Sequence, residues 1–202
     1  MSTERFSLDR RQALGLAGAG LLGLALSACS QDDPLAQQAR AGDNKNYVGG
    51  DGTVTEFAKD QRAAAREYQG TLFDGTKVTG KDLLGSVVVM NFWFAACAPC
   101  RIEAPDLVKL HQEFAPKGVK FFGVNLRDEK ATAEAFEKSF GITYPSFNDK
   151  DGQVLLALSG IAPPNSVPAT LVFDKQGRVS ARIVGELERG TMKTLIQTVL
   201  AE

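Results

Sequence analysis

Histidine is almost absent from this chain of 202 residues and cysteine is scarce, with one histidine and three cysteines in all. A structural zinc site usually needs four cysteine or histidine ligands. His111 follows Cys100 by eleven residues, which corresponds to about 16 Å along a helix. Haem attachment needs a histidine directly after the second cysteine of a pair, and Arg101 stands there. We therefore expect neither a metal ion nor another cofactor.

Positive charge is not in excess either. The 23 lysines and arginines face 24 acidic residues, which gives a net charge of −1. Nucleic-acid-binding proteins usually carry a basic patch, so no nucleic-acid partner is expected. The length suits one domain with appendages, and a hydrophobic content of 44% is ordinary for a globular domain.

The apolar stretch near the N-terminus is too short for a membrane span. It covers residues 14–25, about a dozen residues, which is typical of the apolar region of a signal peptide. Arg5, Arg10 and Arg11 precede it. We predict a signal peptide at residues 1–28.

The run Leu26-Ser27-Ala28-Cys29 resembles the lipobox of bacterial lipoproteins. The resemblance implies that Cys29 becomes the lipidated N-terminus and anchors the protein on the extracytoplasmic face of the membrane. The alternative is an ordinary secretory signal with an incidental cysteine. Arg10-Arg11 ahead of a glycine-diluted apolar region resembles a twin-arginine export signal, although a simple basic region would look similar.

Residues 29–66 are predicted to hold the lipidated cysteine and a flexible tether. From residue 30 to about residue 65 the sequence is polar, with few large apolar side chains. The compact domain is expected to begin near residue 67 and to span residues 67–202.

The apolar pattern from residue 67 onward alternates between strands and helices. A nearly continuous apolar run at residues 86–92 is typical of a central strand covered on both faces. The predicted order is a hairpin (68–79), a strand (86–92), a helix (98–114), a strand (119–126), a helix (130–140), a small insertion (143–158), a hairpin (169–184) and a helix (188–200). We predict one α/β domain: a mixed central sheet with helices on both faces, an N-terminal hairpin and a small central insertion.

Cys97 and Cys100 lie where the apolar strand ends and a helix begins. A helix N-terminus carries unpaired N–H groups and partial positive charge, so it favours the thiolate of Cys97. This predicts a redox-active disulfide in which Cys97 attacks a partner disulfide and Cys100 then attacks Cys97. The alternative is an inert structural disulfide, which so short a loop disfavours.

Three segments together resemble the TlpA/ResA branch of the thioredoxin superfamily. They are Asn91-Phe92-Trp93, the stretch from Cys97 to Pro105 with its Cys-Ala-Pro-Cys-Arg run and Glu103, and Val167-Pro168-Ala169-Thr170. The resemblance implies a thioredoxin fold and a membrane-tethered, extracytoplasmic thiol–disulfide oxidoreductase, which we expect to be a monomer. Such proteins commonly reduce apocytochrome c or other exported proteins, and a membrane electron donor of the CcdA type recharges them.

The same resemblance assigns roles to further residues. Pro168 is implied to be a cis-proline facing Cys97, where it presents the backbone of Val167 to a bound peptide; the alternative is an ordinary trans turn proline. Glu103 is implied to be a partly buried acid that exchanges a proton with Cys100. The alternative for Glu103 is a solvated glutamate favoured by the helix dipole. One departure is Ala96, because the family usually has tryptophan before the first cysteine.

Two other functions remain open from the sequence. A peroxidase of the peroxiredoxin type needs threonine or serine three residues before its cysteine, and Phe94 occupies that position relative to Cys97. A non-catalytic thioredoxin-fold lipoprotein, which binds a metal or a partner and merely keeps its disulfide, is the other. Reduction of insulin by the wild type and by a Cys97→Ser variant separates these possibilities.

Overall fold

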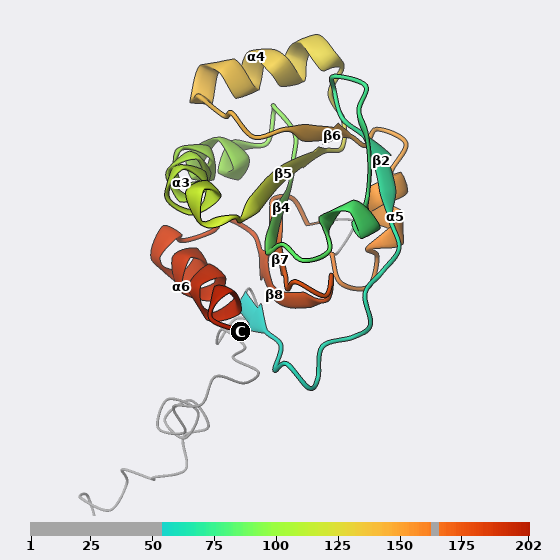
Figure 1. The fold of residues 1–202 in the computed structure, drawn as a ribbon. Helices are drawn as coiled ribbons and strands as arrows, with labels where there is room; N and C mark the ends of the chain where they lie inside the picture. Colours follow the sequence, from blue (N-terminus) through green and yellow to red (C-terminus); the bar gives the residue numbers. More distant parts are fainter. Residues whose placement is uncertain (1–53, 163–165) are drawn as a thin grey trace, which may run out of the picture. The chain divides into compact units, whose positions relative to one another are not determined.

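A mixed six-stranded sheet forms the centre of the computed structural model, which describes residues 54–162 and 166–202 (Figure 1). The elements are β1 (Val54–Glu56), β2 (Gln69–Thr71), β3 (Lys77–Thr79), η1 (Gly80–Leu83), β4 (Val88–Trp93), α3 (Ala98–Phe114), η2 (Ala115–Lys117), β5 (Lys120–Asn125), α4 (Lys130–Phe140), β6 (Ser146–Asn148), α5 (Gln153–Ala157), β7 (Ala169–Phe173), β8 (Val179–Val184) and α6 (Arg189–Leu200). The strand order is β1-β8-β7-β4-β5-β6. Strands β4, β5 and β6 are parallel, and the other neighbours are antiparallel. The predicted α/β fold with a mixed sheet and a separate hairpin, β2–β3, is confirmed.

Strand β4 is buried along its whole length. Val88, Met90 and Phe92 point to one face, where they pack with the hairpin and α5. Val89 points to the opposite face, where it packs with α3 and α6. The strand therefore needs apolar residues at successive positions, which explains the nearly continuous apolar run in the sequence.

Helices and the hairpin cover the two faces of the sheet (Figure 1). Helices α3 and α6 lie together on one face and share a core that includes Leu107, Phe114 and Ile196. The hairpin, η1 and α5 lie on the other face. Helix α4 contributes Ala133 and Phe136 to a third cluster, which also holds the first turn of α3. This third cluster surrounds the cysteine pair.

The ordered domain begins earlier than the sequence analysis expects. Strand β1 pairs antiparallel with β8, with Val54 opposite Ile183, so residues 54–66 belong to the fold rather than to a tether. Arg62 in this segment is only 8% exposed. An edge strand needs few apolar residues, and a buried arginine is tolerated when carboxylates pair with it. Because this segment is polar, its sequence does not indicate that it belongs to the folded domain.

The predictions that concern membrane attachment fall outside the described residues. These are the signal peptide at 1–28, the lipidated Cys29 and the tether as far as residue 53. Across residues 54–162 and 166–202, no helix combines the length and the apolar character that a membrane crossing requires.

Candidate active site

Cys97 is the N-cap residue of α3, in the loop that follows β4. The backbone N–H of Cys100 donates a 3.2 Å hydrogen bond to Cys97 Sγ. Pro99 lies in the first helical turn, where its missing N–H leaves no helical bond unmade. The sulfur of Cys97 therefore lies at the positive end of the helix dipole, as the sequence predicts.

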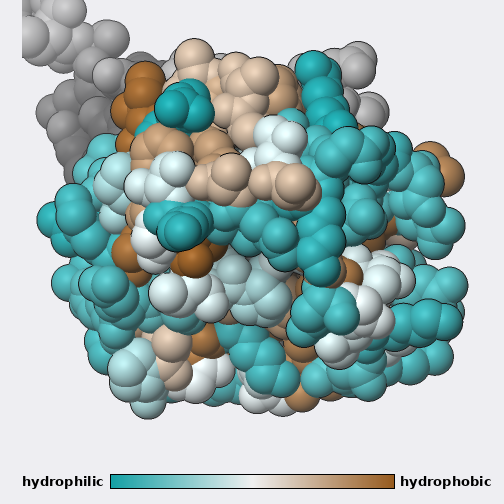
Figure 2. Space-filling view, turned by 90° about the horizontal axis from the view of Figure 1, so that it is seen from above, coloured by the Kyte–Doolittle hydropathy of each residue, from teal (hydrophilic) through white to brown (hydrophobic). Residues whose placement is uncertain are grey.

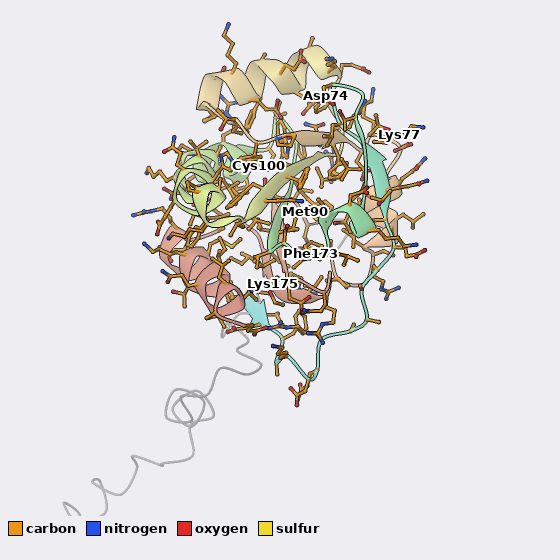
Figure 3. All side chains as sticks on the ribbon, viewed as in Figure 1. Asp74, Lys77, Met90, Cys100, Phe173 and Lys175 are labelled. Atoms are coloured by element: carbon orange, nitrogen blue, oxygen red, sulfur yellow. A yellow bond between two sulfur atoms is a disulfide. The ribbon has the colours of Figure 1, made fainter. Side chains whose placement is uncertain are left out.

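Cys97 and Cys100 form a disulfide, and their Cα atoms are 5.3 Å apart. Cys97 is 5% exposed and Cys100 is 2% exposed, so Cys97 is the more exposed by a small margin. Figure 3 shows Cys100 on α3, beside the strand that carries Met90. A partner sulfur reaches the disulfide only by contacting the residues around it.

Apolar and aromatic side chains surround the disulfide. The indole of Trp93 packs beside it and stacks on Phe136 of α4, with ring centroids 4.5 Å apart. Phe94 is half-buried against the same cluster, whereas Ala96 is exposed. Ala96 stands where the family usually has tryptophan, so no aromatic ring at this position covers Cys97. In Figure 2, which views the molecule from above, apolar colours gather in one area of a mostly hydrophilic face.

The peptide bond between Val167 and Pro168 is cis, as the family resemblance implies. Val167 packs against the cluster that contains both cysteines. The carbonyl of Pro168 accepts a 2.8 Å hydrogen bond from the N–H of Gly185, which ties this loop to the end of β8. The fold thus brings a loop from the distant β7 strand next to the cysteine pair.

Glu103 is buried, with 1% exposure, one turn beyond Cys100 on α3. Its Oε1 accepts a 2.7 Å hydrogen bond from Asn91 Nδ2 on β4, and its Oε2 accepts a 2.9 Å hydrogen bond from the N–H of Leu187. Asn91 also donates to Thr170 Oγ1 on β7, at 3.0 Å. The alternative of a solvated glutamate is therefore wrong, because neighbouring elements enclose this side chain.

Burial raises the pKa of Glu103 from about 4.5 to about 7. The loss of water around the carboxylate is the largest cause, and the hydrogen bonds from Leu187 and Asn91 oppose it. A nearby negative charge on Glu186 adds to the rise. A group with a pKa near neutrality can both accept and return a proton at physiological pH.

Several residues around the site have no functional role assigned from the sequence. The N–H of Leu187 donates to Glu103, the hydroxyl of Thr170 accepts from the Asn91 that also donates to Glu103, and Asp128 accepts from the backbone of the loop before Cys97. A signal for Asp128 exists in the sequence: Asn125 lies near the end of the apolar strand at 119–126 and Asp128 comes just after it, and this strand is parallel to the strand leading to Cys97. Polar residues at the carboxyl ends of adjacent parallel strands meet at one edge of the sheet.

Among the described residues, the cysteine pair does not belong to a metal-binding cluster, and neither cysteine lines the hollow described below. Within the described ranges, no group of three or more histidine, cysteine, aspartate or glutamate side chains is arranged to hold a metal ion. A surface hollow of about 650 Å³ lies beside Tyr68, Leu84 and Phe173, and neither cysteine lines it. Phe173 and Cys100 lie in different parts of the molecule (Figure 3). The candidate active site is therefore the surface around the disulfide.

Comparison of the sequence with known proteins supports the assignment of the cysteine pair as the active site. Residues 56–182 match the model of the AhpC/TSA family. The thiol:disulfide interchange protein HelX of Rhodobacter capsulatus is 31% identical over 187 residues, which cover 92% of this chain and 92% of HelX. The thiol-disulfide oxidoreductase ResA of Geobacillus thermodenitrificans is 33% identical over 118 residues, which cover 58% of this chain and 66% of ResA.

Two proteins of known structure are also similar to this chain. A secreted thiol-disulfide isomerase from Corynebacterium glutamicum is similar with a TM-score of 0.70 and 28% identity, over 78% of this chain and 98% of that one. A DsbF homologue from Corynebacterium diphtheriae is similar with a TM-score of 0.64 and 31% identity, over 76% of this chain and 98% of that one.

The thioredoxin-like fold and the disulfide at the start of α3 define a thiol–disulfide oxidoreductase. The chain belongs to the AhpC/TSA family, in which it is homologous to oxidoreductases of the ResA and HelX type.

Proposed function

We propose that this protein is a reductase of disulfides in exported proteins, apocytochrome c among them, and that it works from the extracytoplasmic face of the bacterial membrane. The observation that carries the proposal is the Cys97–Cys100 pair at the positive end of α3. Glu103 beneath the pair and the cis peptide before Pro168 support it.

Cys97 carries out the first step as a thiolate. Its sulfur attacks one sulfur of the partner's disulfide, so a bond forms between Cys97 and the partner while the partner's own S–S bond breaks. The released partner thiolate takes a proton from solvent. The helix dipole supports this step because it stabilises the negative charge on Cys97 before the attack.

Cys100 completes the reaction with Glu103 as the proton acceptor. The thiol of Cys100 passes its proton to the carboxylate of Glu103, and the resulting thiolate attacks Cys97 Sγ. The Cys97–Cys100 disulfide forms and the second partner thiolate leaves. Over both steps the partner gains two electrons from the two enzyme sulfurs. Because Cys97 reacts as a thiolate, the enzyme supplies only one of the partner's two protons, which leaves Cys100 by way of Glu103, and solvent supplies the other. A glutamate with a pKa of about 7 suits this transfer at neutral pH.

Val167 and Pro168 are proposed to hold the partner during these steps. The loop lies against the cysteine cluster, so the backbone of Val167 is within reach of an extended peptide bound at Cys97. The partner's backbone then pairs with this loop in the manner of an added strand. Such binding depends little on the partner's side chains and suits an enzyme with several protein substrates.

The proposal also includes attachment of the protein to the membrane and the return of electrons to its disulfide. The lipobox at residues 26–29 places a lipid on Cys29, and Arg10-Arg11 directs export by the twin-arginine route. The family resemblance supports a membrane electron donor of the CcdA type, which returns electrons to the Cys97–Cys100 disulfide. The protein acts as a monomer in this scheme.

Substitution of each cysteine tests the proposal. The wild type is expected to reduce insulin, whereas Cys97→Ser and Cys100→Ser variants lose this activity. Cys100→Ser is expected to accumulate mixed disulfides with partner proteins through Cys97, because the resolving sulfur is gone. Non-reducing electrophoresis and peptide mass spectrometry of the trapped species measure this result.

Three outcomes would contradict the proposal or one of its parts. Equal or greater trapping through Cys100 in the Cys97→Ser variant would reverse the two roles. A reduction potential near that of the strong oxidant DsbA, about −120 mV, rather than near that of thioredoxin, about −270 mV, would mark a disulfide donor. Turnover of hydrogen peroxide without reduction of insulin would favour a peroxidase.

A further inference from the structure

The loop that carries Cys97 is tied to the neighbouring strand by a carboxylate. Strands β4 and β5 pair as far as Trp93 and Asn125, and the chain continues beyond each as a loop. The N–H of Ala95 donates a 2.6 Å hydrogen bond to Oδ2 of Asp128 in the β5–α4 loop. Asp128 thus extends the connection between the two strands past the point where their backbone ladder ends.

Asn125 fixes the position of the Asp128 carboxylate. Asn125 is fully buried, and its Nδ2 donates a 2.8 Å hydrogen bond to the same Asp128 Oδ2 that binds Ala95. Its Oδ1 accepts the backbone N–H groups of Arg127, at 3.2 Å, and Asp128, at 2.8 Å. All the polar atoms of the Asn125 side chain are engaged in holding this loop, so the acceptor for Ala95 has a defined place.

Arg101 holds the other side of Ala95. Its Nη1 donates a 3.3 Å hydrogen bond to the carbonyl of Ala95, and its guanidinium lies over the rings of Phe140, at 5.3 Å, and Phe136, at 5.9 Å. Both backbone groups of Ala95 are therefore bound by charged side chains, which come from the β5–α4 loop and from α3. Ala95 lies two residues before Cys97.

We propose that Asp128 is a positioning residue that keeps Cys97 at the N-terminus of α3 when the disulfide opens. In the oxidised protein the S–S bond holds the Cys97 sulfur in place. After reduction, the position of Cys97 depends on its backbone and on the loop before it. Stabilisation by the helix dipole falls off within the first turn, so a shifted loop loses thiolate stabilisation. The inference rests on the proposed role of Cys97 as the attacking thiol.

The charge of Asp128 and its hydrogen bond act on Cys97 in opposite directions. A negative charge near a thiol disfavours the thiolate, so removal of the charge alone lowers the pKa of Cys97. Loss of the hydrogen bond releases the loop and raises that pKa. The other charged groups around the site are Arg101, Glu103, Arg127 and Glu186, and none of them is altered by a substitution at Asp128.

Asparagine and alanine at position 128 separate the two effects. Because one oxygen of Asp128 accepts from both Ala95 and Asn125, the single amide oxygen of Asp128→Asn can keep both hydrogen bonds without the charge. Asp128→Ala loses the charge and the hydrogen bonds together. Glu129→Ala, which removes an exposed charge that pairs only with Lys150 in the described chain, serves as the matched control.

The test measures the pKa of Cys97 in the reduced full-length protein. The rate of alkylation by iodoacetamide is followed against pH, and mass spectrometry of the Cys97 peptide identifies the thiol. We expect Asp128→Ala to raise the pKa of Cys97 by about half a unit to one unit, in keeping with the strength of helix-dipole effects. Asp128→Asn is expected to leave it unchanged or slightly lower, and Glu129→Ala to leave it unchanged.

A second measurement reports directly on the flexibility of the loop before Cys97. Amide hydrogen exchange at Ala95 and Cys97 is expected to become faster in reduced Asp128→Ala and to stay slow in Asp128→Asn. An Asp128→Ala pKa that falls together with that of Asp128→Asn would overturn the inference and leave only a charge effect. A Cys97 pKa at or above that of an ordinary thiol in the wild type would instead overturn the proposed role of Cys97.

Discussion

At the scale of single residues, Glu103 shows how burial changes the chemistry of a side chain. An exposed glutamate in the first turns of a helix is a common stabilising residue. Here the side chain is enclosed, and both of its oxygens accept hydrogen bonds from other elements, at Asn91 and Leu187. The hydrogen bonds favour the charged form, but the loss of water outweighs them and the pKa rises.

The raised pKa of Glu103 predicts a stability that depends on pH. A rise from 4.5 to about 7 corresponds, at about 1.4 kcal/mol per pKa unit, to roughly 3 kcal/mol. The folded protein binds the proton more tightly than the unfolded chain does. This contribution is therefore present below pH 4.5 and is lost as the pH rises to about 7. Relative to wild type, the unfolding free energy of Glu103→Gln is expected to increase by roughly 3 kcal/mol over this interval.

Urea unfolding of both proteins between pH 4.5 and pH 8 measures the effect. Glutamine has one acceptor and one donor group, so it cannot accept hydrogen bonds from both Asn91 and Leu187 as the carboxylate does. We therefore also expect a difference in unfolding free energy between the two proteins that is the same at all pH values. Only the part of the difference that changes with pH reports the titration of Glu103. A difference that stays constant across the range would contradict the raised pKa.

At the scale of elements, the segment from β1 to Arg62 is fastened to the domain by buried charges. Arg62 Nη1 lies 3.0 Å from Asp174 Oδ2 and 2.6 Å from Glu202 Oε2. The side chains of Arg62 and Asp174 are each 2% exposed. The arginine therefore joins the chain before the hairpin to the β7–β8 turn and to the last residue of the chain.

Removal of one partner from this group is expected to destabilise the domain. Arg62→Ala leaves the carboxylate of Asp174 buried with Arg178 as its remaining ion-pair partner, and the loss of unfolding free energy is expected to be about 3 kcal/mol. Arg66→Ala, at an exposed position in the same segment, is the control and should change stability by less than about 0.5 kcal/mol. Urea unfolding at pH 7 compares the two. Equal effects of the two substitutions would mean that the buried ion pairs add nothing beyond surface charge.

At the scale of the whole molecule, the proposed function divides the chain into an anchor and a catalytic domain. The cysteine pair and its surroundings lie within residues 54–202. The proposed lipid site, Cys29, precedes the first described strand by more than twenty residues. Attachment and catalysis therefore depend on different cysteines and can be separated by substitution.

Cys29→Ala is expected to remove the protein from the membrane fraction or to leave unprocessed precursor, because the lipid acceptor is lost. Cell fractionation and labelling with a radioactive fatty acid measure this outcome. Cys97→Ser is the matched control and should remain lipidated and in the membrane fraction while losing activity. A wild-type protein that carries no lipid and stays soluble would show that the lipobox assignment is wrong.

Local patterns in the sequence determined the order of the elements and the place of the cysteine pair. The apolar run of β4, the proline and cysteines at the start of α3, and the glycine that ends α4 are signals read over a few neighbouring residues. These signals are sufficient for a C-x-x-C pair at a strand–helix junction and for an α/β order. The cis peptide bond before Pro168 was predicted from the family resemblance and not from such a local pattern.

Only the tertiary structure decided the burial and the partners of the charged residues. Glu103 meets Leu187 across 84 residues of sequence, and Arg62 meets Asp174 across 112. Asp128 reaches Ala95 across 33 residues. The same residue types would be solvated if the packing of the elements did not enclose them, so local composition carries no sign of their state. Whether such a side chain is a solvated charge, a proton acceptor or a positioning group depends on which distant segments exclude water from it.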